Sequence, residues 1–128
     1  MKKFTVLAFF LCIFGLYIAG CGQRIETFGE APADNAPRTA IGTILLNPKT
    51  YLDKEVVVEG TIASECPAGG FIYVRDNSGG TIYVEMHGAP FAPIPQRTGK
   101  DVSVKGIVYE SNGAKKETKL LGKGLVIK

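Results

Sequence analysis

Five short β-strand patterns, separated or bent by glycine, are the feature that most limits how this chain can fold. They cover residues 55–62, 71–76, 81–86, 101–110 and 120–127. Within each pattern apolar residues tend to alternate with polar ones, which is the period of a strand with one buried face. Glycine-containing turns at residues 77–80 (NSGG) and 111–113 (SNG) suit the positive φ of tight turns.

Strands of this kind fit a small closed barrel better than an open sheet. Closing the sheet leaves no exposed strand edge, and Gly60 and Gly106 fall inside strands, where a barrel strand bends to turn a corner. The chain has 128 residues, which is enough for one small domain. Three prolines within residues 87–99 exclude a regular element there. The sequence therefore predicts an all-β fold with a five-stranded barrel over residues 39–128.

A short helix is expected before the first strand. Ile41, Ile44 and Leu45 recur at helical spacing, and Thr39 is a residue type that caps helices. Pro48 interrupts the pattern and is expected to start a second helical turn.

The strand region resembles the OB-fold. Residues 74–76 (VRD) and 80–84 (GTIYV) are similar to the Leu-Arg-Asp…Gly-x-Ile-Gln-Val stretch of the anticodon-binding OB domains of aminoacyl-tRNA synthetases, and Phe71 matches their aromatic residue four positions before the arginine. Residues 44–60 resemble the lead-in to bacterial extracytoplasmic OB domains. The resemblance covers most of residues 40–128 and implies a binding module, with nucleic acid as a partner through the fold alone.

The first 20 residues have the pattern of an export signal. Lys2 and Lys3 give a positively charged start, and residues 4–20 are uncharged and mostly apolar. This run is marginal for spanning a bilayer of about 30 Å and ends in small residues. We therefore expect a signal peptide over residues 1–20.

The end of this leader, residues 18–21 (IAGC), resembles the lipobox of bacterial lipoproteins. The resemblance implies cleavage before Cys21, a diacylglycerol on its thiol and a fatty acid such as palmitate on its new amine. Acyl chains contribute about 0.8 kcal/mol per buried CH₂, so several of them hold a protein durably on a membrane. Gly22 follows in place of the Asp that favours inner-membrane retention in enteric-type sorting. We expect an extracytoplasmic envelope lipoprotein, on the periplasmic face of the outer membrane if the cell has one; the alternative is a secreted protein with a chance Cys at the cleavage site.

Residues 21–38 are expected to be the lipidated Cys and a flexible tether, because Ala, Pro and Gly are mixed with charges and no apolar period is sustained. Of 15 basic residues, Lys2 and Lys3 lie in the leader, so the rest nearly balance the 12 acidic ones. That balance excludes a strongly basic nucleic-acid arm.

Residue parity sorts the two middle strands into two faces. The residues expected inside the barrel are Ile72, Val74, Ile82, Val84 and Met86. The candidate ligand-binding residues expected on the outside are Phe71, Tyr73, Arg75 and Tyr83. Exposed aromatic rings there would suit base or sugar stacking. The alternative is that the rings simply favour strands and are covered by the helix or the proline segment.

A lysine-rich hairpin is a second candidate binding element. Lys115, Lys116 and Lys119 lie where the last hairpin of an OB-fold borders its usual groove. They could contact the phosphates of a nucleic acid, although the negative charge of Glu85 beside the aromatic residues opposes such binding. A solvated hairpin, or contact with anionic lipid or glycan, are the alternatives.

Cys66 is the one thiol that lipidation and leader cleavage would leave free. Its loop is similar to the Cys-x-x-x-Gly-Cys-Trp motif of a family of periplasmic OB proteins, but Gly70 and Phe71 replace the second Cys and the Trp. Cys66 and His87, with Met86 or Glu85 as a third ligand, could hold copper(I) or zinc. The alternative is an idle thiol.

Catalysis is not expected, because no Ser lies in a Gly-x-Ser-x-Gly elbow and no phosphate-binding loop is present. No cofactor is expected either. The sequence favours a membrane-anchored envelope lipoprotein with a non-catalytic binding module for oligosaccharide, nucleic acid or protein. The alternatives are a metal or redox protein using Cys66 and His87, and a structural envelope protein without a small ligand.

Overall fold

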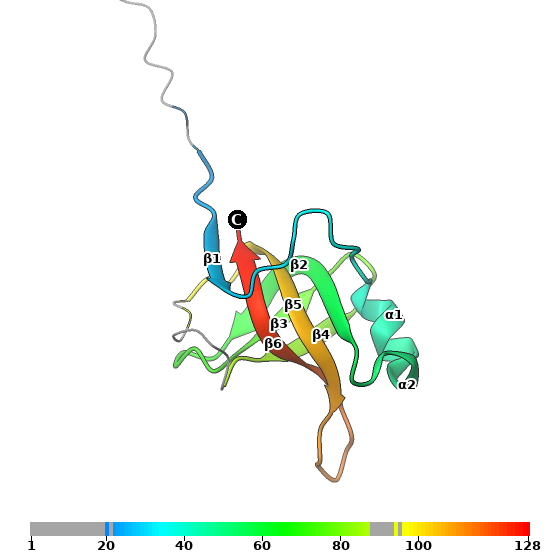
Figure 1. The fold of residues 1–128 in the computed structure, drawn as a ribbon. Helices are drawn as coiled ribbons and strands as arrows, with labels where there is room; N and C mark the ends of the chain where they lie inside the picture. Colours follow the sequence, from blue (N-terminus) through cyan, green and yellow to red (C-terminus); the bar gives the residue numbers. More distant parts are fainter. Residues whose placement is uncertain (1–19, 21, 88–93, 95) are drawn as a thin grey trace, which may run out of the picture.

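The computed structural model describes residue 20, residues 22–87, residue 94 and residues 96–128 (Figure 1). The described residues form six strands and two short helices. In chain order these are β1 (Glu26–Gly29), α1 (Ile41–Leu46), α2 (Pro48–Tyr51), β2 (Glu55–Glu65), β3 (Phe71–Arg75), β4 (Thr81–Glu85), β5 (Asp101–Glu110) and β6 (Thr118–Ile127).

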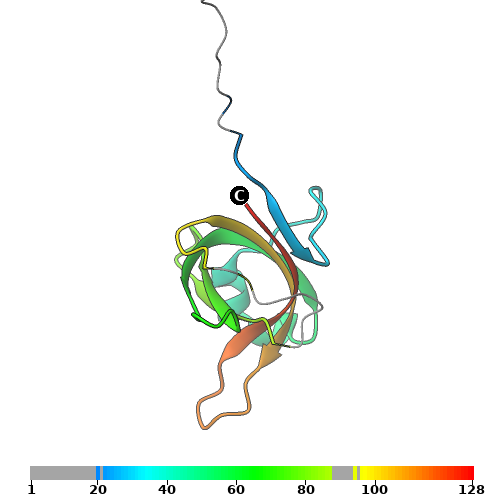
Figure 2. The same ribbon diagram turned by 90° about the vertical axis from the view of Figure 1, so that its left-hand side faces the viewer.

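Five of these strands close into a barrel. The antiparallel pairs are β2–β3, β3–β4, β5–β6 and β2–β5, and β4 pairs with β6 in parallel. Seen end-on in Figure 2, β2 to β6 form a ring and β1 lies outside it. The prediction of an all-β fold with a five-stranded barrel is confirmed, because every strand of the ring has a partner on both sides.

Two glycines allow strands to turn the corners of the barrel. β2 pairs with β5 over residues 55–61 and with β3 over residues 61–65, so it changes partner beside Gly60. A Cβ on Gly60 would lie 2.2 Å from the carbonyl oxygen of Arg75. Gly106 stands at a register shift of β5, with an added Cβ 2.8 Å from the Leu121 carbonyl oxygen. The bends expected at both glycines are therefore present, and each requires a residue without a side chain.

The barrel interior is filled by aliphatic side chains. The five residues assigned to it by parity are all buried, as predicted: Ile72, Val74, Ile82, Val84 and Met86. Ile41 and Ile44 of α1 are fully buried in the same cluster. In Figures 1 and 2, α1 and α2 cover the end of the barrel opposite to the viewer's side of Figure 2.

The N-terminus of α1 is capped differently from the prediction. Its N-cap residue is Ala40, not Thr39, and no side chain of the helix's own first turn caps it. Instead, Asp76 Oδ2 accepts a hydrogen bond from the Ile41 N–H at 2.7 Å, and Ser78 Oγ accepts one from the Gly42 N–H at 2.8 Å. The turn between β3 and β4 therefore satisfies helix donors that are usually capped locally.

The segment expected to be a tether, residues 21–38, contains the strand β1 at residues 26–29, and these four residues differ from that expectation. β1 pairs with residues 124–127 of β6, where β4 has already ended and the strand edge is open. Phe28 of β1 packs against the core. The chain then crosses to β2, where the Thr39 N–H donates to the Val57 carbonyl oxygen at 2.8 Å and Arg38 pairs with Glu59 at 3.0 Å.

The leader and the lipidation residue, residues 1–19 and Cys21, lie outside the described residues, as do Pro90, Pro93 and Pro95. The signal peptide and the lipid on Cys21 therefore stay predictions. Among the helices of the described chain, none is long and apolar enough to cross a membrane.

Candidate binding face

Two cross-strand rows of side chains build the outer surface of β3, β4 and β6. Row by row, the paired residues are Tyr73, Tyr83 and Lys119, then Phe71, Glu85 and Leu121. Directly paired residues point to the same side of a sheet, so residues from three strands share one surface. We call these residues the aromatic face.

The three rings of the aromatic face contact one another. Phe71 stacks on Tyr83 with 5.0 Å between ring centroids, and Tyr73 meets Phe71 and Tyr83 edge-on at 5.7 and 5.4 Å. Such pairs contribute about 0.5–1.5 kcal/mol each beyond the area that they bury. Tyr73 is 37% exposed, and the other two rings are half-buried. The rings are therefore already arranged, and one of them is open to a ligand.

Lys119 is the hairpin lysine that the structure brings to the aromatic face. Its Nζ lies 4.4 Å from the ring centroid of Tyr83, within the range of a cation–π contact, and 3.7 Å from Glu117. Lys115 and Lys116 lie instead in the loop between β5 and β6, which projects away from the barrel in Figures 1 and 2. Lys116 pairs there with Glu110 at 3.9 Å.

Arg75 has the predicted exposure but a different neighbourhood. It ends β3, two residues beyond Tyr73, and lines a separate pocket with Thr61, Asp76 and Asp101. The structure therefore brings Phe71, Tyr73, Tyr83 and Lys119 together but leaves Arg75, Lys115 and Lys116 apart from them.

Glu85 is a functional candidate in its own right, beyond the opposing charge or third metal ligand expected from the sequence. Its Oε2 accepts a hydrogen bond from the Tyr83 hydroxyl at 3.0 Å, and its Oε1 lies 2.6 Å from His87 Nδ1. Burial opposes ionisation, but hydrogen bonds from the His87 N–H, the imidazole and Tyr83 lower the pKa of Glu85 below its usual range. Burial and then the Glu85 carboxylate raise the pKa of Tyr83 to about 12.

At neutral pH the face therefore presents an ionised carboxylate beside a protonated phenol. Glu85 lies two residues after Tyr83 on the same strand, so the alternation that places Tyr83 on the outer side also places Glu85 there. The outward position of Glu85 could therefore be predicted from the sequence.

The His87 side chain lies against Gly70. A Cβ on Gly70 would lie 2.2 Å from Cε1 of the His87 ring, so the imidazole rests directly on the Gly70 backbone. The histidine side chain is nevertheless 77% exposed. A cysteine at position 70, as in the motif that this loop resembles, would displace the imidazole.

Cys66 lies in the loop between β2 and β3 and is half-buried. Its N–H donates to the Phe71 carbonyl oxygen at 3.0 Å, and its own carbonyl accepts from Gly69 at 2.9 Å. Within the described ranges, no group of three or more His, Cys, Asp or Glu residues could hold a metal ion. Met86 is buried inside the barrel, and His87 Nδ1 is paired with Glu85. The metal hypothesis for Cys66 and His87 therefore gains no supporting contact.

No family model matches the chain, and no curated protein matches it. Several solved structures are similar to it. An aspartyl tRNA synthetase from Entamoeba histolytica has a TM-score of 0.57 at 10% identity, over 73% of this chain and 21% of the synthetase. OBody AM2EP06 bound to hen egg-white lysozyme has a TM-score of 0.53 at 25% identity, over 74% of this chain and 96% of the OBody. The hypothetical protein ygiW from E. coli has a TM-score of 0.50 at 17% identity, over 77% of this chain and 95% of that one.

These likenesses agree on the fold. The chain spans about a fifth of the synthetase, so the similarity concerns one domain of that enzyme and not its activity. Strand order and strand pairing in the barrel are of the OB type. The described chain is therefore an OB-like barrel with an added N-terminal strand.

Proposed function

We propose that the protein is a non-catalytic binding module whose ligand lies across the aromatic face. The observation that carries the proposal is the contacting trio Phe71, Tyr73 and Tyr83 on the surface of β3 and β4. In OB-folds this surface is the one that binds oligonucleotides and oligosaccharides. Rings that already hold one another in place lose little side-chain freedom when a ligand stacks on them, which favours binding.

An uncharged oligosaccharide fits this face better than a nucleic acid. The ionised Glu85 would repel a phosphate, but it accepts hydrogen bonds readily from sugar hydroxyls. Lys119 already contacts the Tyr83 ring and Glu117, and Lys115 and Lys116 lie in the projecting loop, so the described residues form no continuous positive track beside the rings.

A protein partner is the second candidate. Tyr73 and Leu121, in neighbouring rows of the face, are 37% and 42% exposed, and such apolar side chains serve as contact residues in protein interfaces. The likeness to an OBody bound to lysozyme supports the idea that a barrel of this shape can present such a surface.

The double variant Tyr73→Ala/Tyr83→Ala tests the face. Removing two aromatic contact residues, at about 1–2 kcal/mol each, should weaken binding at least about 30-fold. Uncharged tetrasaccharides built from glucose, N-acetylglucosamine, mannose or galactose, and a thymidine oligonucleotide, would be titrated by isothermal titration calorimetry, a readout that does not depend on the substituted tyrosines.

The matched control is Tyr73→Phe/Tyr83→Phe, which keeps both rings and should retain most of the affinity. Equal affinity of the folded alanine variant and the unmodified protein would show that the face is not the site. If no sugar binds, the oligosaccharide assignment is wrong. If Glu85→Gln leaves the weak binding of the oligonucleotide unchanged, the electrostatic argument against nucleic acid is wrong.

We further propose that the module is held in the cell envelope by a lipid on Cys21. The charged start, the apolar run and the lipobox-like ending of residues 1–21 support this placement. An extracytoplasmic glycan or envelope protein would then be within reach of the aromatic face.

Cys21→Ser should abolish incorporation of labelled palmitate, because it removes the thiol whose modification precedes leader cleavage. Intact-mass measurement should also show that residues 1–20 are retained. Cys66→Ser is the matched control, since it removes the other thiol of the mature chain and should label normally. Normal labelling and normal cleavage of Cys21→Ser would contradict the anchor.

A further inference from the structure

A pocket of about 390 Å³ lies beside β1 and the end of β6. In Figure 1 these segments are at the opposite end of the molecule from the projecting β5–β6 loop. The pocket opens between β1, the end of β6 and the turn at residues 96–100. Its lining includes Arg24, Glu26, Arg97, Lys100 and Lys128. Its volume is within the range of small-molecule sites, and its only lining carboxylate side chain among the described residues is that of Glu26.

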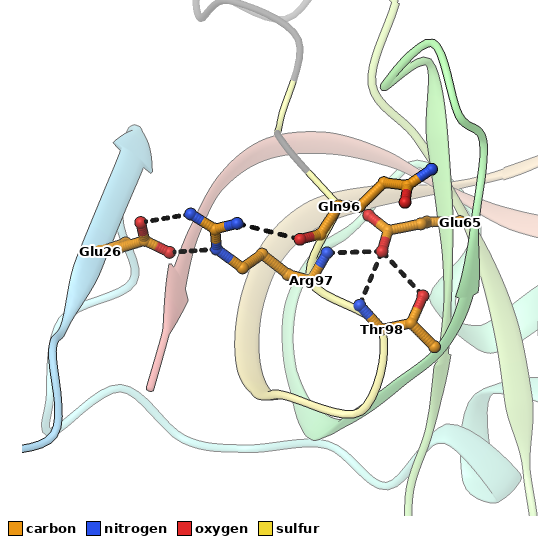
Figure 3. A network of polar contacts seen from close by, with 5 residues as sticks. All are labelled: Glu26, Glu65, Gln96, Arg97 and Thr98. Carbon is orange, nitrogen blue, oxygen red and sulfur yellow. Dashed lines mark hydrogen bonds and ion pairs between the residues drawn. The ribbon is translucent and has the colours of Figure 1, made fainter.

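Arg97 is fixed in this pocket by contacts on both sides (Figure 3). Its Nε and Nη2 donate to the two oxygens of Glu26 at 2.7 and 2.8 Å, and its Nη1 donates to the Gln96 carbonyl oxygen at 2.9 Å. On the other side, Glu65 accepts hydrogen bonds from the Thr98 N–H at 2.6 Å and the Thr98 hydroxyl at 2.7 Å, as well as from the Arg97 N–H. The turn and its guanidinium are therefore pre-organised.

Among the described contacts, two N–H groups of the Arg97 guanidinium have no acceptor. Arginine has five N–H donors, and the three bonds above use one on each nitrogen, so Nη1 and Nη2 each retain one. Guanidinium N–H groups that remain available are suited to hydrogen bonds with phosphate oxygens.

The pocket also has an excess of positive charge. The hydrogen bond from Arg97 lowers the pKa of Glu26, although burial opposes this shift. The positive charges of Arg97, Arg24 and Lys100 lower this pKa further. Glu26 is therefore ionised at neutral pH, and Glu65 adds a second carboxylate beside Arg97, but the four cations that line the pocket outnumber these two carboxylates. An anion entering the pocket would reduce the repulsion among the cations that remain.

We propose that this pocket binds a phosphate group through Arg24, Arg97 and Lys100. Arg24 lies three residues after Cys21, so the headgroup of an anionic phospholipid is the favoured source, and this part of the inference rests on the proposed lipid anchor. A free phosphate would use the same donors. Bound to a headgroup, the pocket would hold the β1 end of the barrel against the membrane, with the projecting β5–β6 loop directed away from it.

The test uses the full chain, ¹⁵N-labelled, in uncharged maltoside micelles. The amide signals of Thr98 and Lys100 would be followed on addition of lyso-phosphatidylglycerol, of lyso-phosphatidylcholine, and of inorganic phosphate at an ionic strength held constant with chloride. We expect saturable shifts with lyso-phosphatidylglycerol and none with lyso-phosphatidylcholine. Arg24→Gln/Lys100→Gln should weaken the response about tenfold. Lys115→Gln/Lys116→Gln removes the same charge in the projecting loop and should leave the response unchanged.

Equal weakening in the two double variants would overturn the site in favour of non-specific charge attraction. Saturation by inorganic phosphate without a response to lyso-phosphatidylglycerol would overturn the headgroup assignment. No response to either anion would overturn the inference altogether. Each result is independent of the anchor and the aromatic face, because palmitate labelling and the Tyr73/Tyr83 variants are read out separately.

Discussion

Leu120→Ala is expected to lower the free energy of unfolding by about 2–5 kcal/mol, the range for removing a large aliphatic side chain from a packed core. Leu120 is fully buried on β6. It pairs with Val84 of β4 on one side and Val108 of β5 on the other, both also fully buried. The cavity would therefore form where the parallel and antiparallel pairs meet to close the barrel, and backbone on both sides would resist collapse into it.

Leu121→Ala is the matched control for this change. Leu121 is the next residue of the same strand, points to the opposite side and is 42% exposed. Its truncation should cost less than about 1 kcal/mol. Urea unfolding followed by far-ultraviolet circular dichroism would compare the two full-length variants. Equal losses would show that parity does not define the barrel interior on β6.

Gly60→Val should destabilise the fold by about 3 kcal/mol or more, at or above the upper end for overpacking a core. A Cβ at this position would lie 2.2 Å from the Arg75 carbonyl oxygen and 2.8 Å from its carbonyl carbon. These are backbone atoms of β3, held in register by the pairing of Arg75 with Thr61 and Thr81. Relief of the clash therefore requires β2 and β3 to separate at the corner where β2 changes partner.

Gly113→Ala is the control for the glycine substitution. An added Cβ there would have its nearest neighbour at 3.4 Å, an ordinary contact, in the exposed loop between β5 and β6. We expect a change within about 0.5 kcal/mol. Hydrogen exchange would separate the outcomes, because Gly60→Val should lose protection in β2 and β3 first. Full protection of both strands in Gly60→Val would contradict the argument.

The strands and their faces were predictable because a barrel strand repeats every two residues. Ile72 and Val74 alternate with Tyr73 and Arg75 in the sequence, and the same alternation separates buried from outward side chains in the structure. The bends at Gly60 and Gly106 were also predictable, since a glycine within a strand marks a close approach of another backbone.

The N-terminal strand could not be predicted in this way. Residues 26–29 (ETFG) carry one large apolar side chain, Phe28, and no sustained period. Their strand conformation depends on the open edge of β6 at residues 124–127, far away in the sequence. The cap of α1 by Asp76 and Ser78 was missed for the same reason, because helix capping is inferred from adjacent residues and these residues lie in another turn.

The candidate site was likewise predictable only in part. Parity placed Phe71, Tyr73 and Tyr83 outward, but the contacts among their rings and the position of Lys119 over Tyr83 depend on which strands are neighbours. Arg75 shares their parity yet lies in a different pocket, because parity gives the side of a strand and not the position along it.

By itself the sequence determined the local periods: five alternating strands, their glycine bends and the buried face of the two middle strands. Only the tertiary structure decided which edges meet, and with them the added strand β1, the Tyr83–Glu85–His87 contacts and the cations gathered around Glu26. The physical reason is that alternation is set by backbone geometry within one strand. Pairing between distant segments is set instead by which edges and apolar surfaces remain uncovered once the barrel has closed.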